Sequence, residues 1–366
     1  MEKMLDLYTD YLISSTGQVS ATGLSRLIDG ALSHDSIRRF LLHNDFDSKT
    51  LWLSVKGLVR GHESESACLI FDDCIIEKPH MDENALISWH YDHSKGRSVK
   101  GINLLSAFYV SSKTPDSEPL CVPVLYEFIL KTIYFCVVKT KKETRQSPVT
   151  KNELMQTMIA QCMHNQLIFK YILADSWFAS TDNMHFIAAK KKQFIFEMKE
   201  NRLAVLVSKQ GLQKPTKNAD WTNISQLDLP DNTPVQVWLK DMDFPVLMTK
   251  QVFKNEDKAF TGIRFLVSND LSLSNKQFLD IYKKRWKVEE YHKSLKQNAS
   301  IAKSPAHAVK TQVNHLFCAL AAFVKMEKIK CATQTGHFQL KAKIYIKAIK
   351  AAFNELNIIK QQMQPA

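Results

Sequence analysis

The chain of 366 residues contains only 10 glycines and 11 prolines, which excludes a linker-rich or low-complexity protein. With 45% hydrophobic residues, it is long enough for one large domain or two ordinary ones. Its 49 Lys and Arg against 37 Asp and Glu leave a net charge of +12. This excess favours a polyanionic partner, because cations placed on phosphates release condensed counterions.

The seven cysteines include no CxxC pair and are odd in number, which argues against a disulfide framework or a structural zinc site. The N-terminal segment carries acidic residues where a secretory signal would carry basic ones. No stretch of the sequence approaches the ~20 apolar residues of a membrane helix. We therefore expect no membrane partner, and a protein that is cytoplasmic, or nuclear if eukaryotic.

Residues 1–62 are predicted to be helical, with two periodic segments on either side of Asp29-Gly30. The second of these segments carries Arg38 and Arg39. A short turn between two small helices is typical of a helix-turn-helix DNA-binding element, which makes these arginines candidate DNA-binding residues. A plain helical hairpin that packs on the core is the alternative, and the residues alone leave both open.

Residues 63–204 alternate between apolar runs and helical segments, the pattern of an α/β fold. A capping box, Thr150-x-x-Glu153, begins one helix, and a second helix starts near Thr181. The predicted strands are residues 67–71, 99–110, 122–138, 169–174 and 193–198. We expect a mixed sheet with covering helices.

Residues 205–268 hold short β-like segments separated by polar turns, which predicts a β-rich insertion in that core. A second capping box, Ser274-x-x-Gln277, opens a long helix that runs to about residue 297. The segment that follows, residues 305–366, is predicted to be helical and is basic.

Two of the predicted strands stop at carboxylates, the first at Asp72-Asp73 and the other at Asp175. In open α/β sheets, ligands bind in the crevice at the carboxyl ends of strands. Two carboxylates brought together there repel each other unless a cation lies between them, and magnesium favours carboxylate oxygens with water and phosphates. For either aspartate alone, an ordinary turn or cap residue is the alternative.

The helix from residue 274 to 297 places four chemically distinct side chains on one face. Tyr282, Arg285, Glu289 and Lys296 stand at offsets of 0, 3, 7 and 14 residues. At about 100° per residue they fall within an arc of roughly 60°. A carboxylate with cations on either side could bind a metal ion and phosphates. The simpler interpretation is that Arg285 and Glu289, one helical turn apart, only form an ion pair with each other.

The pattern Y-x2-R-x3-E-x6-K formed by these four residues resembles the signature helix of the insertion-sequence-four family of bacterial transposases. Asp72 after an apolar strand is similar to the first catalytic motif of that family. Asp175-Ser176-Trp177-Phe178 is similar to the second, an Asp with an aromatic residue three positions on. The β-rich segment before the glutamate also matches, and the resemblance covers nearly the whole chain.

The resemblance implies a ribonuclease-H-like fold in which Asp72, Asp175 and Glu289 are the catalytic residues and hold two Mg²⁺ (or Mn²⁺) ions. It also implies that Tyr282, Arg285 and Lys296 bind DNA phosphates. The expected activity is cut-and-paste transposition by DNA cleavage and strand transfer at terminal inverted repeats. The expected partners are double-stranded transposon ends and target DNA, bound by a homodimer in the cytoplasm of a bacterium, nucleoid-associated when on DNA.

Under this interpretation the chain has five regions: a DNA-binding region (1–62), the first part of the core (63–204), the β-rich insertion (205–268), the catalytic helix (269–304) and a helical C-terminal region (305–366). One departure is the first motif, where the family has Asp-x-Thr and this chain has Asp72-Asp73-Cys74. A shift of strand register by one residue would make Asp73 the ligand, because neighbouring side chains face opposite ways.

Two tryptophans lie close to the motifs, Trp177 and Trp286, and we expect both to be core residues. Two other functions fit the same sequence. One is a nuclease of the same fold without strand transfer. The other is a transposase relic that binds DNA without cutting it, although such a relic would be expected to lose the carboxylates.

Overall fold

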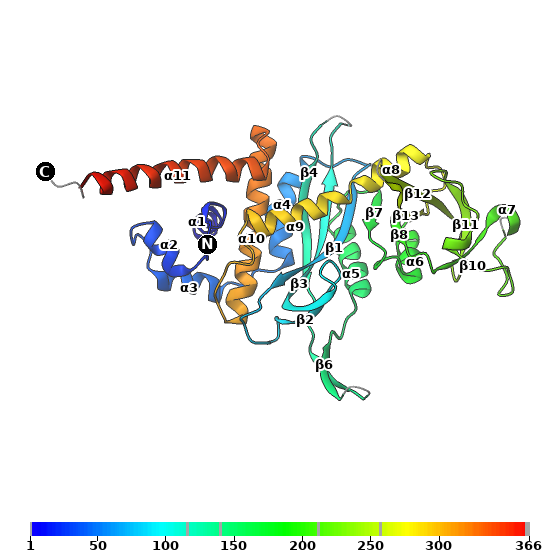
Figure 1. The fold of residues 1–366 in the computed structure, drawn as a ribbon, viewed down its shortest axis with the longest axis horizontal. Helices are drawn as coiled ribbons and strands as arrows, with labels where there is room; N and C mark the ends of the chain where they lie inside the picture. The colour runs from blue at the N-terminus through cyan, green and yellow to red at the C-terminus, as the bar shows by residue number, and fades with distance from the viewer. Residues whose placement is uncertain (1, 115–116, 139–140, 211–212, 256–257, 363–366) are drawn as a thin grey trace. The chain divides into compact units, whose positions relative to one another are not determined.

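The structure is a computed structural model that describes residues 2–114, 117–138, 141–210, 213–255 and 258–362. It divides into two compact units, which we call the helical unit and the sheet unit. The helical unit comprises Met1–Arg60, Ile75–Asn103 and Glu290–Ala366, and the sheet unit comprises Gly61–Cys74 and Leu104–Glu289. Together they give a mixed α/β fold with a large mixed sheet and helices at both ends of the chain (Figure 1).

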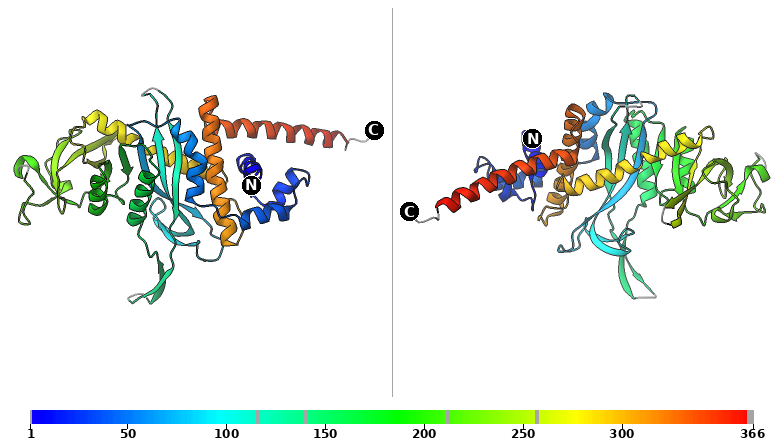
Figure 2. Two further views of the ribbon diagram at one scale, coloured as in Figure 1. Left: turned by 180° about the vertical axis from the view of Figure 1, so that it is seen from behind. Right: turned by 45° about the horizontal axis from the view of Figure 1, so that its top comes forward.

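The helical unit is built around one long helix. Its helices are α1 (Glu2–Ser14), α2 (Ala21–Leu27), α3 (His34–His43), α4 (Ser48–Arg60), α10 (Val309–Thr333) and α11 (His337–Gln362). Helices α1, α3 and α4 contact α10, and buried side chains such as Leu12, Ile37, Val55 and Phe317 fill the space between them. The last helix, α11, extends beyond the other helices of this unit in each of the three views (Figures 1 and 2).

The predicted turn between two small N-terminal helices is confirmed. Helix α2 ends before Asp29 and Gly30, whose φ angles of 52° and 76° are left-handed. Glycine adopts this conformation without strain. Ser33 then caps α3 by accepting a hydrogen bond from the backbone N–H of Ser36.

The sheet unit contains most of a single sheet whose strands follow the order β10-β9-β11-β12-β13-β8-β7-β1-β3-β2, with β4 also paired to β3. The strands are β1 (Cys68–Glu77), β2 (Ser88–Asp92), β3 (Arg97–Ser111), β4 (Leu120–Phe128), β7 (Tyr171–Ala174), β8 (Gln193–Met198), β9 (Leu203–Leu206), β10 (Thr222–Asn223), β11 (Val235–Leu239), β12 (Val246–Asn255) and β13 (Lys258–Ser268). Strand β7 pairs in parallel with β1 and with β8, whereas the other pairings with a defined register are antiparallel.

Two helices pack beside the sheet of this unit, α5 (Lys151–His164) and α6 (Thr181–Ala189). Helix α5 starts with the predicted capping box, in which Thr150 and Glu153 exchange hydrogen bonds. The buried Asn183 joins the two helices, because its side chain accepts from Gln156 and donates to Asn152. These contacts fix the start of α6, which lies a few residues after the end of β7.

The expected end of the first strand is wrong. Strand β1 does not stop at Asp72-Asp73 but continues to Glu77. The alternation of side chains explains this continuation, since Cys74 and Ile76 are buried again after the two aspartates. The apolar run 67–71 marks only the half of the strand that has both faces covered. The aspartates therefore lie in the middle of a strand.

One further expectation is wrong, and another can be described more fully. The apolar stretch 122–138 is not one strand, because β4 ends at Phe128 and a separate hairpin of β5 (Ile133–Val137) and β6 (Lys142–Gln146) follows. The segment 205–268 is rich in strands as predicted, with two short helical turns, α7 (Val207–Gln210) and η1 (Ile224–Gln226). However, its strand β13 pairs with β8, so the segment extends the core sheet.

The long helix predicted from residue 274 is two helices, α8 (Asn275–Lys283) and α9 (Trp286–Gln297). The capping box of Ser274 and Gln277 begins α8 as predicted. Between the two helices, the backbone N–H groups of Lys284 and Arg285 bond to carbonyls three residues back rather than four. This tighter turn changes the angular phase of the helix, so a single α-helical wheel does not describe residues 282–296.

Candidate active site

The parallel pairing of β1 and β7 brings two of the predicted site residues to the same level of the sheet. Ile70 of β1 stands opposite Leu173 of β7. Two residues further along each segment are Asp72, still within β1, and Asp175, the first residue after β7. The two carboxylates lie close enough to interact, because the charge of Asp175 contributes to the raised pKa of Asp72.

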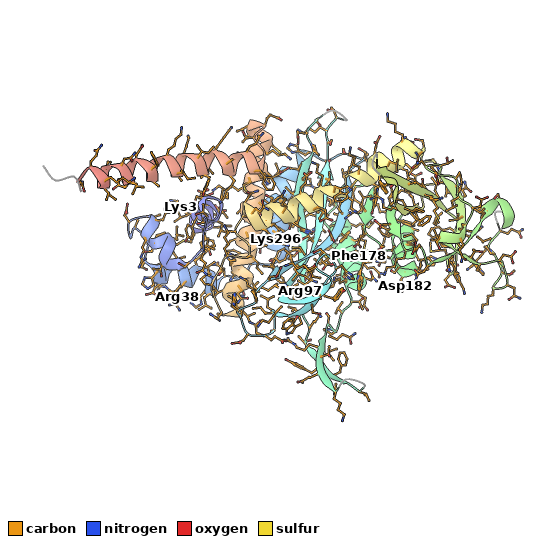
Figure 3. The ribbon with its side chains drawn as sticks, viewed as in Figure 1. Lys3, Arg38, Arg97, Phe178, Asp182 and Lys296 are labelled. Atoms are coloured by element: carbon orange, nitrogen blue, oxygen red, sulfur yellow. The ribbon has the colours of Figure 1, made fainter. Side chains whose placement is uncertain are left out.

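The end of β7 forms a tight turn that holds Asp175. Its carboxylate accepts a hydrogen bond from the backbone N–H of Trp177 (3.0 Å), and its carbonyl accepts one from Phe178 (3.3 Å). The Phe178 side chain is 1% exposed and anchors the turn in the core (Figure 3). The aromatic residue three positions after the aspartate therefore has a structural role, because it anchors the turn that orients the carboxylate.

Glu289 approaches these residues from the first turn of α9. One of its carboxylate oxygens and one of Asp72 lie within 4.8 Å of each other. The Glu289 side chain is 47% exposed, so solvent and ligands can reach the pair. Carboxylate oxygens at such separations are the hard ligands that Mg²⁺ and Mn²⁺ accept.

The ionisation of the aspartates reflects this crowding. Burial raises the pKa of Asp72 well above its usual range, and the nearby carboxylates of Glu289, Asp73 and Asp175 raise it further. Burial also raises the pKa of Asp175, with a smaller contribution from Asp73. A divalent cation relieves both effects, because it replaces lost hydration and offsets the repulsion between like charges. The donor set therefore fits a magnesium or manganese site.

Asp73 has a different partner from Asp72. Both of its carboxylate oxygens accept hydrogen bonds from Nζ of Lys151, at 2.7 and 2.8 Å, at the start of α5. An ammonium group at this distance competes with a metal ion for the same oxygens. The geometry therefore favours Asp72 over Asp73 as the carboxylate that faces Glu289, in the register chosen from the sequence.

Arg285 lies at the break between α8 and α9 and is 8% exposed. Its guanidinium pairs with Glu289 at 3.3 Å, and its charge lowers the pKa of Asp72 against the effects that raise it. The ring centroids of Tyr282 and Trp286 lie 5.7 and 5.3 Å from its central carbon. Its Nε is buried and has no hydrogen-bond partner among the described residues. A cation is therefore held beside the carboxylates with one donor unused.

Tyr282 is also buried, at 1% exposure, and its hydroxyl lies 3.3 Å from a carboxylate oxygen of Glu197 on β8. Arg264 of β13 lies over its ring at 5.2 Å. The expectation of four side chains on one accessible face is thus only partly right. Tyr282 and Arg285 are buried, whereas Glu289 and Lys296 are exposed on α9; Figure 3 shows Lys296.

The predicted DNA-binding arginines lie in the helical unit. Arg38 is exposed on α3, with its side chain 4.0 Å from Asp35 (Figure 3). Arg39 is exposed on the same helix and lies 3.4 Å from the hydroxyl of Ser36. Both side chains are exposed and therefore accessible to a ligand.

The sequence interpretation missed several residues around the site. Trp177 and Trp286 were expected in the core but are 49% and 52% exposed, which is unusual for the largest apolar side chain. Lys151 and Glu197 were also overlooked. Of these residues, only Trp177 could have been suspected from the sequence, because it lies in the turn directly after Asp175. The others lie on separate helices and strands, and the sequence does not show which of these elements meet.

Carboxylates that could hold divalent ions are typical of metal-dependent enzymes that act on phosphodiesters. Comparison with known families supports this class. The family described as "Transposase DDE domain" matches residues 139–324, and the family described as "DDE superfamily endonuclease" matches residues 1–220.

Each match spans more than half of the chain, and the protein therefore belongs to the DDE transposase and endonuclease superfamily. Members of the transposase family are metal-dependent DNA phosphoryltransferases, so the chain carries a domain for DNA cleavage linked to transposition. A comparison with curated proteins finds no match. Among the described residues, no helix combines the length and the apolar character needed to cross a bilayer.

Proposed function

We propose that this protein is a cut-and-paste transposase of the insertion-sequence-four type, with a ribonuclease-H-like core. It cleaves DNA at terminal inverted repeats and transfers the freed strand to target DNA. Asp72, Asp175 and Glu289 are the proposed catalytic carboxylates. The observation that carries the proposal is the approach of Glu289 to within 4.8 Å of Asp72, with Asp175 at the end of the neighbouring strand β7.

The same three carboxylates would hold the divalent ions, two Mg²⁺ or Mn²⁺ in the expected arrangement. When bound, such ions activate the attacking oxygen and neutralise the charge on the leaving oxygen of a phosphodiester. The residues of the chain contribute position and charge. Asp72 and Asp175 are fixed by the sheet and by the turn after β7, whereas Glu289 enters from a helix and is partly exposed.

Arg285 is proposed to bind the phosphate next to the cleaved bond. Its guanidinium is restrained by Glu289 and by two aromatic rings, which keeps its positive charge beside the carboxylates. Tyr282 holds the guanidinium in place through ring contact. Lys296, exposed on α9, together with Arg38 and Arg39 on α3, would contact the DNA backbone.

The main alternative is a nuclease that cleaves DNA without joining it. The two functions differ in one measurable product, the covalent joint between a transposon end and target DNA. Purified protein is incubated with Mg²⁺, supercoiled target DNA and a labelled fragment that carries the repeats flanking its own gene. We expect cleavage at the repeats and labelled strand-transfer product. Cleavage without joining would favour the nuclease, and neither product would favour the relic.

The matched control pair for this assay is Glu289→Gln and Glu290→Gln. The two glutamates are neighbours on α9 and both are exposed, but only Glu289 approaches Asp72. Loss of both products in the first variant and retention in the second supports the assignment. Retention of cleavage and joining in Glu289→Gln overturns it.

We further propose that the active form is a homodimer whose contact is α11. Every third or fourth residue of this helix is apolar in a heptad pattern: Phe338, Ala342, Tyr345, Ile349, Ala352, Leu356 and Ile359. The large members of this stripe are 42–48% exposed, and His337 is the only buried residue of the helix. A stripe of this kind stabilises a structure only when a partner covers it.

Charge favours a second copy as that partner. Beside the stripe, Glu355 precedes Lys360 by five residues. In a parallel two-stranded coiled coil, positions with this spacing on the two helices meet across the interface. Each Glu355 would therefore face the partner's Lys360, twice by symmetry. The opposite face, which carries Lys343, Lys347 and Lys350, would stay in water or meet DNA.

A further inference from the structure

The hairpin of β5 and β6 stands apart from the rest of the sheet unit. Its strands form a two-stranded sheet of their own, separate from the large one. In each view of Figures 1 and 2 it extends away from the other strands of that unit. A two-stranded hairpin is at best marginally stable in water by itself. A partner that covers it would therefore stabilise it.

Three consecutive large side chains of β5 are exposed. The exposed fractions are 48% for Ile133, 61% for Tyr134 and 41% for Phe135. Because side chains alternate along a strand, Ile133 and Phe135 share one face of the hairpin and Tyr134 lies on the other. There Tyr134 stands opposite Arg145, whose central carbon lies 5.2 Å from the ring centroid. Exposed apolar surface on a projecting element is typical of an interaction site.

The hairpin is also strongly basic. The sequence from Lys131 to Gln146 contains five basic residues and one acidic residue, a net charge of +4 out of +12 for the whole chain. Lys141 is exposed in the turn before β6, and Nε of Arg145 donates to the carbonyl of Lys131 (2.8 Å). A second copy of this basic chain would be repelled by the hairpin, whereas a polyanion would be attracted.

The chain connects the hairpin closely to the candidate active site. Strand β6 ends at Gln146, and α5 begins at Lys151, whose Nζ is bonded to Asp73 beside the proposed ligand Asp72. A strand of this length spans about 17 Å, which equals about five base pairs of DNA at ~3.4 Å each. Duplex DNA with one phosphodiester at the carboxylates can therefore reach the hairpin within a few base pairs.

We propose that the β5–β6 hairpin binds target DNA, in a groove of the duplex next to the phosphodiester that is attacked. The inference rests on the proposed function and assigns a surface to one of its two DNA partners. A two-stranded ribbon fits the major groove. Lys141 and Arg145 contact phosphates at the borders of the groove, and Ile133 and Phe135 lie against its floor. Phosphate contacts position DNA without reading its sequence, which suits a target that need not carry the terminal repeats.

The first test measures binding of a repeat-free duplex, in buffer without divalent metal so that no cleavage occurs. Lys141→Asn removes the charge and keeps the turn, because asparagine tolerates the positive φ of 53° at this position. We expect the slope of log Kd against log salt concentration to fall by about 1 in Lys141→Asn, and by about 2 when Arg145→Gln is added. Affinity near physiological salt should fall about tenfold in the double variant.

The matched control is Lys191→Asn. Lys191 is an exposed lysine of the same unit with nearly the same backbone angle, φ 56°, in the turn after α6. Its substitution should leave slope and affinity unchanged. A second pair separates apolar contact from charge. Phe135→Ser should weaken binding without changing the salt slope, whereas Phe253→Ser, at a phenylalanine of similar exposure (45%) on β12, should change neither.

A second test distinguishes target DNA from the transposon end. The double variant should bind a duplex that carries the terminal repeats within about twofold of the wild-type affinity, because other surfaces hold that DNA. In the strand-transfer assay the ratio of joined to cleaved ends should fall about tenfold, in proportion to the weaker binding of target DNA. Lys191→Asn should keep the wild-type ratio.

Wild-type affinity and salt slope in the double variant would overturn the proposal. An equal loss of affinity for both duplexes would overturn the assignment to target DNA, and equal effects of Lys141→Asn and Lys191→Asn would show an effect of overall charge. The binding results do not depend on catalysis. If Glu289→Gln retained cleavage and joining, the proposed function would fail while the binding of repeat-free DNA by the hairpin would stand.

Discussion

Asp72 and Asp73 are adjacent, yet the strand gives them different partners. Asp72 faces Glu289, whereas Asp73 is paired with Lys151 through two short hydrogen bonds. A two-residue acidic run can therefore supply one ligand for a cation and one anchor for the helix that covers the sheet. The side-chain alternation of β1 separates the two tasks.

This separation predicts different results for two conservative variants. Asp72→Asn should reduce metal-dependent DNA cleavage by at least about a hundredfold, because a proposed ligand is lost. Asp73→Asn should keep most of the activity and lower the free energy of unfolding by about 1 kcal/mol, because it loses the partly buried pair with Lys151. Cleavage assays and thermal unfolding measure the two effects. Equal losses of activity would show that the register assignment is wrong.

The raised pKa values of Asp72 and Asp175 predict how pH affects the metal-free protein. Their folded-state pKa lies above the usual carboxyl value of 3.8, so the folded state binds protons more tightly than the unfolded state. Stability should therefore fall as pH rises from about 3.8 through the raised pKa values, and Mg²⁺ should restore it.

Asp72→Asn removes the buried charge, so it should weaken this pH dependence and abolish the stabilisation by Mg²⁺. In metal-free buffer at neutral pH the variant should melt higher than the wild type, by roughly 2–4 °C for each kcal/mol of repulsion relieved. Thermal unfolding with and without Mg²⁺ across this pH range checks the prediction. An unchanged Mg²⁺ response in the variant would contradict it.

At the scale of elements, the break between α8 and α9 shows what periodicity can and cannot predict. The capping box that begins α8 could be predicted, because it depends on local sequence. The tighter turn at Lys284 and Arg285 could not, since no glycine or proline marks it. It is accompanied by Tyr282 packing against Glu197 of β8 and Arg264 of β13, a tertiary contact that overrides the helical pattern.

Helix α11 carries the second element-scale prediction. Ile349→Asp places a charge in the apolar stripe and should convert a dimer into a monomer. Ile358→Asp is the matched control, because it makes the same change at a residue of similar exposure, 49% against 48%, on the opposite side of the helix. Analytical ultracentrifugation without DNA measures the outcome. Equal behaviour of both variants would argue against α11 as the dimer contact.

A charge exchange tests the orientation of the two helices. Glu355→Lys alone should weaken the dimer, since it places like charges opposite each other. Adding Lys360→Glu should recover the loss in a parallel coiled coil. The expected effect is small, about 0.3–1 kcal/mol for each exposed pair, so dissociation constants must be compared at low ionic strength. No recovery in the double variant would indicate another arrangement.

At the scale of the whole molecule, the sequence was most informative where chemistry follows from local order. The alternating strands and helices, the capping boxes, the N-terminal turn and the C-terminal helices could all be predicted. The attachment of residues 205–268 to the core could not, because strand pairing between β13 and β8 depends on contacts between distant segments. The exposed tryptophans were missed for the same reason, since hydrophobicity alone predicts burial.

The central claim is that Asp72, Asp175 and Glu289 converge to bind divalent cations against a phosphodiester. The most direct measurement is anomalous diffraction from crystals of the protein bound to DNA and Mn²⁺. Two anomalous peaks are expected within ligand distance, roughly 2.0–2.3 Å, of oxygens from these three residues. Peaks bound elsewhere, or carboxylates of these three residues that share no ion, would contradict the account.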